Sequence, residues 1–290
     1  MSEPASDYDA LQSLPPLRDV IRDHNLRAEK ALGQNFLLDL NVTDKIARSA
    51  ESMGGALKDV TVFEIGPGPG GLTRSLLGTE AKKIIAIEFD DRAVAALADV
   101  VKVAKGRLDV IKADALHANL IAMADGARAI IANLPYNIST VLLLKWLRDL
   151  RQDPEHYKFM ALMFQKEVAD RLVAKPHTKE YGRLSVMVQW LCTIGKAFDL
   201  PPEAFSPPPK VTSSIVVFRP KILPADAPAF ETLEKILSIG FQQRRKMIRT
   251  SLKIYMAEIE MLGIDPTLRT ENLTVDDYVR IAQAVERRQQ

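Results

Sequence analysis

Short apolar runs alternate with amphipathic stretches through the middle of the chain. The runs are VTVFEI (60–65), KIIAIE (83–88), LDVIKAD (108–114), ARAIIAN (127–133) and KFMALMFQ (158–165), and the helical stretches between them are 72–77, 92–101 and 139–150. Apolar runs of this length are typical of buried strands, and a strand–helix–strand repeat predicts a parallel sheet with helices on both faces. Before the first run, a helical pattern after Asn41 reaches a plausible stop at Gly54-Gly55.

Two later apolar runs have no helical stretch between them. They are LSVMVQWLC (184–192) and SSIVVFR (213–219), and both resemble strands. Strands joined without a crossover helix pair antiparallel, so we expect an antiparallel addition at one edge of the sheet. The single cysteine, Cys192, lies in the first of these runs, cannot form an internal disulfide, and is expected to be an inert core thiol.

Three prolines, at 220, 224 and 228, separate this region from a purely helical pattern. The later apolar positions recur at helical spacing over 230–241, 247–252 and 275–285. We therefore predict a domain of residues 1–220 and a small all-helical domain of residues 221–290. Residues 1–16 are polar or small, end in Pro15-Pro16, and are expected to be a disordered lead.

Composition narrows the class of protein only a little. The chain has 290 residues, 47% of them hydrophobic, with a net charge of +2. A balance this mildly basic does not by itself indicate a nucleic-acid partner. The chain has no apolar run of bilayer length, and its first ten residues contain neither a basic segment nor an apolar core. We expect a soluble, cytoplasmic monomer with no membrane partner.

A glycine-rich loop follows the first predicted strand. The segment Gly66-Pro67-Gly68-Pro69-Gly70-Gly71 fits the dinucleotide pattern G-x-G-x-x-G, which is a weak signal alone. Pro67 and Pro69 lack the backbone N–H groups that a pyrophosphate would need, and the carboxylate of Glu64 would repel it. A ligand that carries an amine and a sulfonium suits the loop better.

Two acidic residues close the next two strands. Glu88 stands 22 positions after Gly66 (88 minus 66), where a carboxylate can accept hydrogen bonds from ribose hydroxyls in either class of cofactor. Asp114 follows the third strand, where it could accept from an adenine amine. The alternative for Asp114 is a helix N-cap.

The fourth strand ends in Asn133-Leu134-Pro135-Tyr136, which carries the most specific chemistry in the chain. An exocyclic adenine amine is a poor nucleophile because its lone pair is delocalised. If the Asn133 carboxamide oxygen and the Leu134 carbonyl each accept one N–H, the lone pair is aimed at an electrophile. Pro135 would fix the Leu134 carbonyl, and Tyr136 would stack on the base. The alternative is an ordinary turn after a strand.

If the adenine amine belongs to a base in folded RNA, an enzyme can reach it only when that base is unpaired or flipped out. A second aromatic wall is then expected, and Phe205 in Phe205-Ser206-Pro207-Pro208-Pro209-Lys210 is our candidate. The alternative for Phe205 is a core phenylalanine.

The whole set of motifs resembles the ribosomal RNA adenine dimethyltransferases of the KsgA type. The matching segments are Gly33–Leu37 (GQNFL), Glu64–Gly68 (EIGPG), Asn133–Thr140 (NLPYNIST), Gln165–Val168 (QKEV), Tyr181–Ser185 (YGRLS), Phe205–Lys210 (FSPPPK) and Phe241–Lys246 (FQQRRK). They are spread from about residue 30 to residue 250. The resemblance implies a Rossmann-like class I methyltransferase sheet, mostly parallel with an antiparallel edge strand, plus a small all-helical C-terminal domain.

The resemblance also implies roles for individual residues. S-adenosylmethionine would be held by Asn35 and Leu37 at its methionine end, by the loop of Gly66 and Gly68, by Glu88 at the ribose and by Asp114 at the adenine, with Asn133 between cofactor and base. It implies S-adenosylhomocysteine as the product and no metal.

The implied substrate is the pair of adjacent adenosines in the 3′-terminal hairpin loop of 16S rRNA, within the 30S subunit or its precursor, each dimethylated at N6 during subunit biogenesis. The sequence departs from the family at Val141, where proline is usual, and at Pro69-Gly70-Gly71.

Five cations lie close together in the helical part of the chain: Arg244, Arg245, Lys246, Arg249 and Lys253. We expect them on one helix, with the last three on one face at spacings of three and four. The ordinary explanation is a solvated helix face, but five cations with no acid between them favour phosphate contact. Another four, Arg18, Arg22, Arg27 and Lys30, are candidates to extend this RNA surface.

Three other functions stay open. The first is an Erm-type methyltransferase of large-subunit rRNA. The second is a nucleic-acid-binding assembly factor that keeps the fold without the activity, and intact Asn133, Glu88 and Asp114 argue against it. The third, more distant, is a nicotinamide-dependent dehydrogenase.

Overall fold

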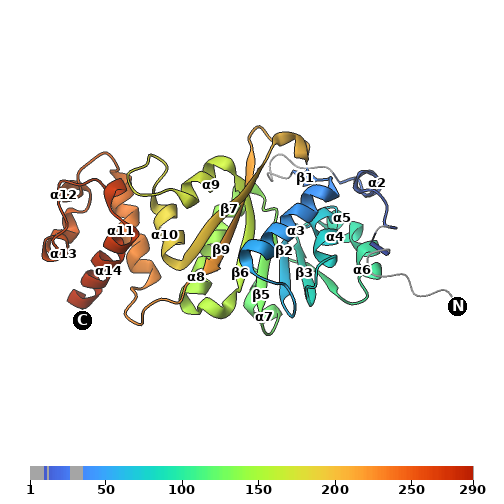
Figure 1. The fold of residues 1–290 in the computed structure, drawn as a ribbon, viewed down its shortest axis with the longest axis horizontal. Coiled ribbons are helices and arrows are strands. Elements are labelled where there is room, and N and C mark those ends of the chain that lie inside the picture. Colours follow the sequence, from blue (N-terminus) through green and yellow to red (C-terminus); the bar gives the residue numbers. More distant parts are fainter. Residues whose placement is uncertain (1–9, 12, 27–34, 290) are drawn as a thin grey trace. The chain divides into compact units, whose positions relative to one another are not determined.

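The computed structural model describes residues 10–11, 13–26 and 35–289 (Figure 1). Within them the chain divides into two compact units. The first contains the described residues up to 145 together with 155–166 and 195–219, and the second contains residues 146–154, 167–194 and 220–289. The second unit thus combines the C-terminal helices with two earlier segments. Gly33, Gln34, Arg27 and Lys30 lie outside the described residues.

A seven-stranded mixed sheet forms the first unit's framework. Its strands, in sequence order, are β2 (Thr61–Ile65), β3 (Lys83–Glu88), β4 (Leu108–Lys112), β5 (Arg128–Ala132), β6 (Phe159–Gln165), β7 (Cys192–Leu200) and β9 (Ser213–Pro220). The spatial order is β4-β3-β2-β5-β6-β9-β7. The five strands from β4 to β6 are parallel, and β9 pairs antiparallel with β6. The predicted parallel sheet and antiparallel addition are both confirmed.

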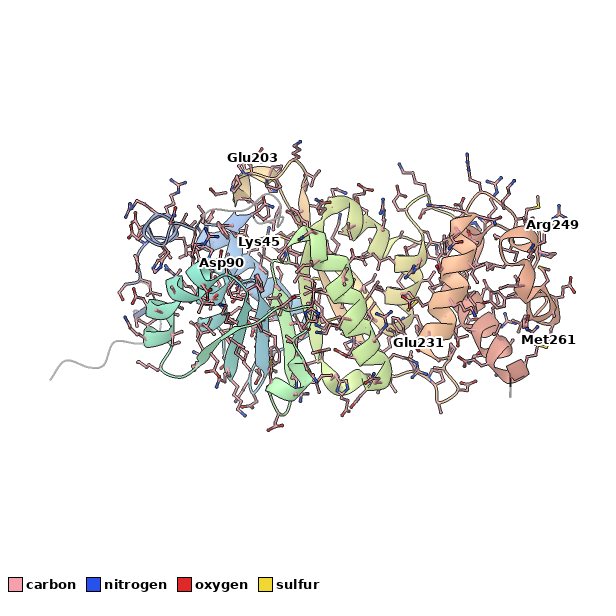
Figure 2. All side chains as sticks on the ribbon, turned by 180° about the vertical axis from the view of Figure 1, so that it is seen from behind. Lys45, Asp90, Glu203, Glu231, Arg249 and Met261 are labelled. Atoms are coloured by element: carbon pink, nitrogen blue, oxygen red, sulfur yellow. The ribbon has the colours of Figure 1, made fainter. Side chains whose placement is uncertain are left out.

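Helices connect the parallel strands. The described helices before β6 are α2 (Leu17–Asp23), α3 (Leu40–Gly54), α4 (Gly71–Leu77), α5 (Asp91–Ala96), α6 (Ala98–Val103), α7 (Leu120–Met123) and α8 (Tyr136–Gln152), followed by the 3₁₀ turn η2 (Pro154–His156). Asp39 and Asp90 begin α3 and α5 by accepting hydrogen bonds from main-chain N–H groups two residues ahead. Figure 2 labels Asp90. Gly55, with φ of 125°, ends α3 as predicted.

The central strands β2, β3, β5 and β6 are buried on both faces, as expected for parallel strands under helices, whereas the edge strands β4 and β7 are partly exposed. One face meets α3 and α4 in a single apolar cluster that includes Val62, Ile84, Ile131, Met163 and Leu76. The intervening residues point the other way and are equally buried, as the 0% exposure of Phe63 and Ile130 illustrates. Both faces of these central strands therefore lie in the core, which leaves their ends to form a site.

A second, two-stranded sheet brings two distant segments together. β1 (Phe36–Leu37) pairs antiparallel with β8 (Phe205–Ser206), so that Leu37 lies opposite Phe205. Another small turn, η3 (Pro202–Ala204), precedes β8. Near the start of the described chain, Leu14 packs against the core and the Pro15 carbonyl accepts a hydrogen bond from Arg74. The expected disordered lead therefore does not extend to these residues, and residues 1–9 and 12 lie outside the described ones.

The second unit contains the later helices. They are α9 (Lys166–Val173), α10 (Arg183–Leu191), α11 (Phe230–Gln242), α12 (Ile248–Ser251), α13 (Met256–Met261) and α14 (Val275–Gln289), with the 3₁₀ turns η4 (Lys253–Tyr255) and η5 (Thr270–Asn272). The aromatic rings of Phe241 and Tyr278 join α11 to α14, with ring centroids 6.0 Å apart. The predicted helical pattern after residue 220 is confirmed, while a functional division at that residue stays a prediction.

The run LSVMVQWLC, predicted as a strand, is a helix up to Leu191, and only Cys192 begins a strand. A continuous apolar run fits a buried helix as well as a buried strand, so periodicity could not decide. Ser185 decides it locally, because its hydroxyl accepts from the Gly182 N–H at the first turn of α10. Cys192 is buried, which raises the pKa of its thiol to about 12, in keeping with an inert core residue.

The five clustered cations do not share one helix, which corrects the sequence prediction. Helix α11 ends at Gln242, so the first three cations lie in a turn, Arg249 lies in α12, and Lys253 begins a 3₁₀ turn. Between α11 and α12 the main chain leaves helical geometry at Gln243, with φ of −117° and ψ of 44°, and the N–H of Ile248 at the start of α12 donates to the Leu268 carbonyl at 2.7 Å. Within the described residues, no helix combines the length and apolarity needed to span a bilayer.

Candidate functional site

A cavity of about 240 Å³ opens at the carboxyl ends of the parallel strands, where the chain order reverses between β2 and β5. Open α/β sheets bind ligands at this point. The lining includes all ten residues that the sequence assigned to the cofactor and to the amine: Asn35, Leu37, Gly66, Gly68, Glu88, Asp114, Asn133, Leu134, Pro135 and Tyr136. Since one water needs roughly 10–15 Å³ of such space, the cavity suits a small molecule.

The glycine loop lets β1 approach the cavity closely. A Cβ atom on Gly68 would lie 3.0 Å from the ring of Phe36, and one on Gly71 would lie 2.7 Å from the Leu37 carbonyl oxygen. Gly68 also has φ of 55°, which other residues adopt only with strain. These glycines are therefore required for β1, and with it Asn35, to sit against the loop.

The loop has little to offer an anion. The N–H of Gly66 donates to the Ile87 carbonyl, that of Gly70 donates to the Pro67 carbonyl, and that of Gly68 donates to the carboxylate of Glu88. The prolines between them have no N–H. Three glycine N–H groups of the loop, those of Gly66, Gly68 and Gly70, are therefore already engaged within the protein and are not free to cradle a pyrophosphate.

The lining of the cavity is acidic. Glu64, Glu88, Asp90 and Asp114 all contribute to it, and among its residues in the described part of the chain there is no lysine, arginine or histidine. Low-dielectric walls strengthen the field of the carboxylates of Glu88, Asp90 and Asp114. The cavity therefore favours a ligand that carries positive charge and disfavours a phosphate.

Glu64 is buried beneath the loop with 2% of its surface exposed. Burial raises the pKa of its carboxyl to about 8, against the opposing effect of a 2.6 Å hydrogen bond from Thr73 Oγ1, and the charge of Glu88 raises it further. At pH 7 this carboxyl is mostly protonated in the folded protein. A cationic ligand would favour its ionised form, whereas a phosphate would oppose it.

Glu88 is fixed by the main chain around it. Its Oε1 accepts from the N–H groups of Phe89 and Asp90 at 2.7 and 2.9 Å, and its Oε2 accepts from Gly68 at 3.3 Å. A carboxylate offers about four lone-pair positions, so acceptor capacity remains for hydroxyl groups of a ligand.

Asp114 shapes the turn after β4. Its Oδ1 accepts from the Leu116 N–H at 2.9 Å and its Oδ2 lies 3.0 Å from Nδ1 of His117. The helix that follows, α7, is instead capped by Asn119. The helix N-cap alternative for Asp114 is therefore wrong: the residue organises a turn whose members Asp114, Ala115 and Leu116 line the cavity.

Asn133 follows β5 and faces the cavity. Its Nδ2 donates to the main-chain carbonyl of Asn35 at 3.1 Å. The amide nitrogen of Asn133 therefore faces the segment of β1. The carboxamide oxygen then remains as the atom that can accept a hydrogen bond from a ligand. The bond also joins two motifs that are 98 residues apart in the sequence.

Tyr136 begins α8 directly after Pro135. Its hydroxyl is hydrogen-bonded to the hydroxyl of Ser213, the fully buried first residue of β9, at 2.6 Å. Burial raises the pKa of the Tyr136 phenol, which keeps it neutral. The ring is therefore fixed at both ends, by the helix and by Ser213, and presents a flat surface at the cavity.

Phe205 is placed differently from the other aromatic candidate. It is 4% exposed, belongs to the apolar cluster under α3 and α4, and is not among the residues that line the cavity. This position matches the core alternative, and stacking on a base would require the ring to leave the core.

The structure adds aromatic residues that sequence reasoning passed over. Phe89, 70% exposed, lines the cavity next to Glu88, and Phe36 lines it next to Gly68. The signal for Phe89 was present: a large apolar residue at a loop otherwise made of acids, directly after a buried strand.

The five cations belong to the second unit and differ in their surroundings. Arg244 Nε donates to Glu271 at 2.6 Å, and its Nη2 donates to the Thr178 carbonyl at 3.2 Å. Arg245 and Lys246 are exposed, as are the two later members of the set. Arg244 is thus held by its own unit, while Arg245 and Lys246 face solvent.

The described residues contain no group of three side chains suited to a metal ion.

Comparison with known protein families shows to which family the chain belongs. The family described as ribosomal RNA adenine dimethylase matches residues 25–287, which is most of the chain. The chain belongs to the ribosomal RNA adenine dimethylase family. Its Rossmann-like sheet, with the antiparallel strand β9 and a helical C-terminal region, is the fold that the sequence predicted for this family.

Relatives within the ribosomal RNA adenine dimethylase family are similar over their whole length. The "Ribosomal RNA small subunit methyltransferase A" of Allorhizobium ampelinum is 53% identical over 277 residues, 94% of this chain and 98% of the relative. A dimethyladenosine transferase from Plasmodium falciparum has a solved structure with a TM-score of 0.72 and 27% identity, covering 86% of this chain and 96% of that one. The structure of the 23S rRNA methyltransferase ErmE, at 24% identity, TM-score 0.64 and coverage of 87% and 100%, shares the fold.

The raised pKa of Glu64 generates a prediction about stability. The unfolded chain ionises this carboxyl near pH 4.5, whereas the folded chain keeps its proton up to about pH 8. Raising the pH between these values therefore lowers the stability of the wild type relative to Glu64→Gln, by on the order of 1 to 3 kcal/mol. We expect the difference in unfolding free energy, measured by urea denaturation, to grow from pH 5 to pH 8 and then level off.

The matched control is Glu203→Gln, at an exposed glutamate on the first unit (Figure 2). An equal pH trend in both variants, or none in Glu64→Gln, would contradict burial as the cause.

Proposed function

We propose that this protein transfers methyl groups from S-adenosylmethionine to the N6 amines of two adjacent adenosines in the 3′-terminal hairpin loop of 16S rRNA, giving N6,N6-dimethyladenosines during small-subunit biogenesis. Family membership supports the reaction class, and the names of the 50–53% identical relatives support the small subunit. The observation that carries the chemistry is the hydrogen bond from Asn133 Nδ2 to the Asn35 carbonyl.

The cavity fits S-adenosylmethionine by its donor set. Acidic walls suit a ligand with an ammonium and a sulfonium, and the engaged N–H groups of Gly66, Gly68 and Gly70 argue against the pyrophosphate of the dehydrogenase alternative. Asn35, Leu37 and the loop of Gly66 and Gly68 would hold the methionine end, with Glu88 at the ribose and Asp114 at the adenine. When bound, this molecule supplies a methyl group on a positively charged sulfur.

The residues after β5 would prepare the adenine amine. With its nitrogen committed to Asn35, the Asn133 carboxamide presents its oxygen to one N–H of the amine. The Leu134 carbonyl, whose direction Pro135 restricts, would accept the other. Two acceptors hold the nitrogen toward tetrahedral geometry and free its lone pair, so alignment supplies most of the rate enhancement. A general base is not required, because the methylated nitrogen becomes acidic and loses its proton to water.

The base itself would rest on Tyr136. Stacking of a base on an aromatic side chain contributes about 1 to 3 kcal/mol, which offsets part of the cost of removing the base from its stack. The hydrogen bond to Ser213 keeps the ring in place before RNA arrives, so less rotamer freedom is lost on binding.

The exposed cations of the second unit would bind the RNA backbone. Arg245, Lys246, Arg249 and Lys253 face solvent and are suited to phosphate, while Arg244 supports the turn that carries the first two. We further propose that the protein acts as a cytoplasmic monomer on the 30S subunit or its precursor.

The Erm-type alternative rests on a shared fold, since the ErmE structure is 24% identical, and the relatives at 50% identity or above carry small-subunit names. The assembly-factor alternative predicts that the site residues can be lost without consequence for transfer. Both are decided by measuring transfer itself.

Replacing Asn133 with alanine tests the site and the function together. We expect labelled methyl transfer to unmethylated small subunits to fall about 100-fold or more, because the amine loses an acceptor that acts during the reaction. Affinity for S-adenosylhomocysteine should fall less than tenfold. Nucleoside analysis of the wild-type product should give N6,N6-dimethyladenosine.

The matched control is Asn119→Ala, which removes the cap of α7 outside the cavity lining. Transfer by Asn133→Ala at the wild-type rate would refute the mechanism, and wild-type transfer to large but not small subunits would establish the Erm-type reading.

Replacing Ser213 with alanine tests the fixed Tyr136 ring. We expect kcat/KM for small subunits to fall roughly three- to tenfold, because the ring gains freedom that base stacking must remove. Affinity for S-adenosylhomocysteine should stay the same. The neighbouring Ser214 is equally buried but donates to Asp199, so Ser214→Ala is a matched control. Equal losses in both variants would assign the effect to the strand and not to Tyr136.

Replacing Arg245 and Lys246 with alanine tests the RNA surface. The slope of log affinity for small-subunit RNA against log salt should become shallower by about 1.4 to 1.8, since each phosphate contact contributes about 0.7 to 0.9. Lys235→Ala, at an exposed lysine of α11, should leave the slope alone. Arg244→Ala should instead lower the melting temperature through loss of its bond to Glu271. An unchanged slope in the double variant would remove this turn from the RNA surface.

A further inference from the structure

We propose that Lys145 is a positioning residue: it ties the turn that carries Asp114 to helix α8, and so sets the part of the cavity that receives the adenine end of the cofactor. This inference rests on the proposed function, because it assigns a role within the same site. Neither the sequence motifs nor the similarity to relatives pointed to this residue.

The contact is formed by a single ammonium group. Lys145 lies on α8, nine residues after Tyr136, which begins that helix. Its Nζ donates to the main-chain carbonyl of Ala115 at 3.1 Å and also to that of Ala118. Ala115 lines the cavity between Asp114 and Leu116. The lysine therefore holds the turn at Ala115, which lines the cavity, and at Ala118, its last residue.

The N–H of Ala113, directly before the turn, donates to the Glu88 carbonyl and ties the start of the turn to the end of β3. The hydrogen bonds of Asp114 determine the shape of the turn. Asp114 accepts from Leu116 through its side chain, and its carbonyl accepts from the N–H groups of His117 and Ala118. All of these bonds lie inside the turn. Those from Lys145 differ because they connect the turn to a separate element about 30 residues away in sequence.

The hydrogen bonds of Lys145 span the part of the sheet where the order of the strands along the chain reverses. Strand β4 leads into the turn and β5 leads into α8, and β3 and β2 lie between them in the sheet. Three strand spacings of about 4.8 Å separate the two strands by about 14 Å. The long side chain of Lys145 covers part of that distance between α8 and the turn after β4. Lys145 thus links the cofactor side of the site, at Asp114, to the substrate side, at Asn133 and Tyr136.

Binding of S-adenosylhomocysteine, measured by calorimetry, tests the inference without RNA. We expect Lys145→Met to weaken binding about five- to twentyfold, because the turn loses its anchor and Asp114 no longer meets the adenine in place. Lys145→Arg should restore most of the affinity, since a guanidinium can also donate to two carbonyls. The matched control is Lys158→Met: Lys158 donates to the Ala56 carbonyl at 2.7 Å, away from the cavity, and its loss should change affinity less than twofold.

Two readouts separate positioning from general stability. With small subunits, KM for S-adenosylmethionine should rise by the same factor in Lys145→Met, while kcat at saturation falls less than threefold. In an Asp114→Asn background, Lys145→Met should weaken binding no further, because the lysine acts through that carboxylate.

Wild-type affinity in Lys145→Met, equal losses in Lys145→Met and Lys158→Met, or additive losses with Asp114→Asn would each overturn the inference. The outcome is independent of the RNA assignment. If wild-type protein fails to methylate small subunits but binding follows the expected pattern, the proposed substrate is wrong and the role of Lys145 stands.

Discussion

The hydrogen bond from Asn133 Nδ2 to the Asn35 carbonyl decides which atom of the Asn133 carboxamide faces the cavity. A free asparagine can present either its oxygen or its nitrogen to a ligand. Here the nitrogen is committed to β1, so the oxygen becomes the group that meets an amine. Nucleophilic use of an adenine amine depends on acceptors of this kind, and a donor in the same place would bind the ring nitrogens instead.

That bond depends in turn on how closely β1 can approach the glycine loop. Gly68 and Gly71 have no Cβ, and the space a Cβ would take is occupied by the Phe36 ring and the Leu37 carbonyl. The positions of the loop, β1 and the end of β5 therefore depend on one another. The cavity that they line has acidic walls, and three of the loop's N–H groups are engaged within the protein, which together favour a cationic ligand over a phosphate. The same sheet geometry that serves dinucleotides elsewhere is thus restricted here to a different chemistry.

The sequence predicted the parts of the molecule that follow local rules. Five buried strands, the loop after the first of them and the acids after the next two could be placed because strand length, glycine spacing and position at a strand end are all local signals. The strand predicted at 184–192 is wrong because an apolar segment buried on all sides has no diagnostic period. The single helix predicted for Arg244 to Lys253 is wrong because the main chain leaves helical geometry at Gln243.

Other features of the site had no local signal at all. The bonds of Tyr136 to Ser213 and of Lys145 to Ala115 join residues 77 and 30 positions apart, and neither pair stands out in sequence. The burial of Phe205 is likewise a property of the assembled core. From the sequence alone, an aromatic residue in a proline-rich loop is equally compatible with an exposed ring that stacks on a base. Positioning residues of this kind are found only when the fold is known.

The central claim concerns the orientation of one amide, and a crystal structure of the protein with S-adenosylhomocysteine and adenosine tests it most directly. The account predicts Asn133 Oδ1 within about 2.7 to 3.2 Å of the adenosine N6, with Nδ2 still on the Asn35 carbonyl. A carboxamide turned away from N6, or reversed so that its nitrogen faces the base, would contradict it.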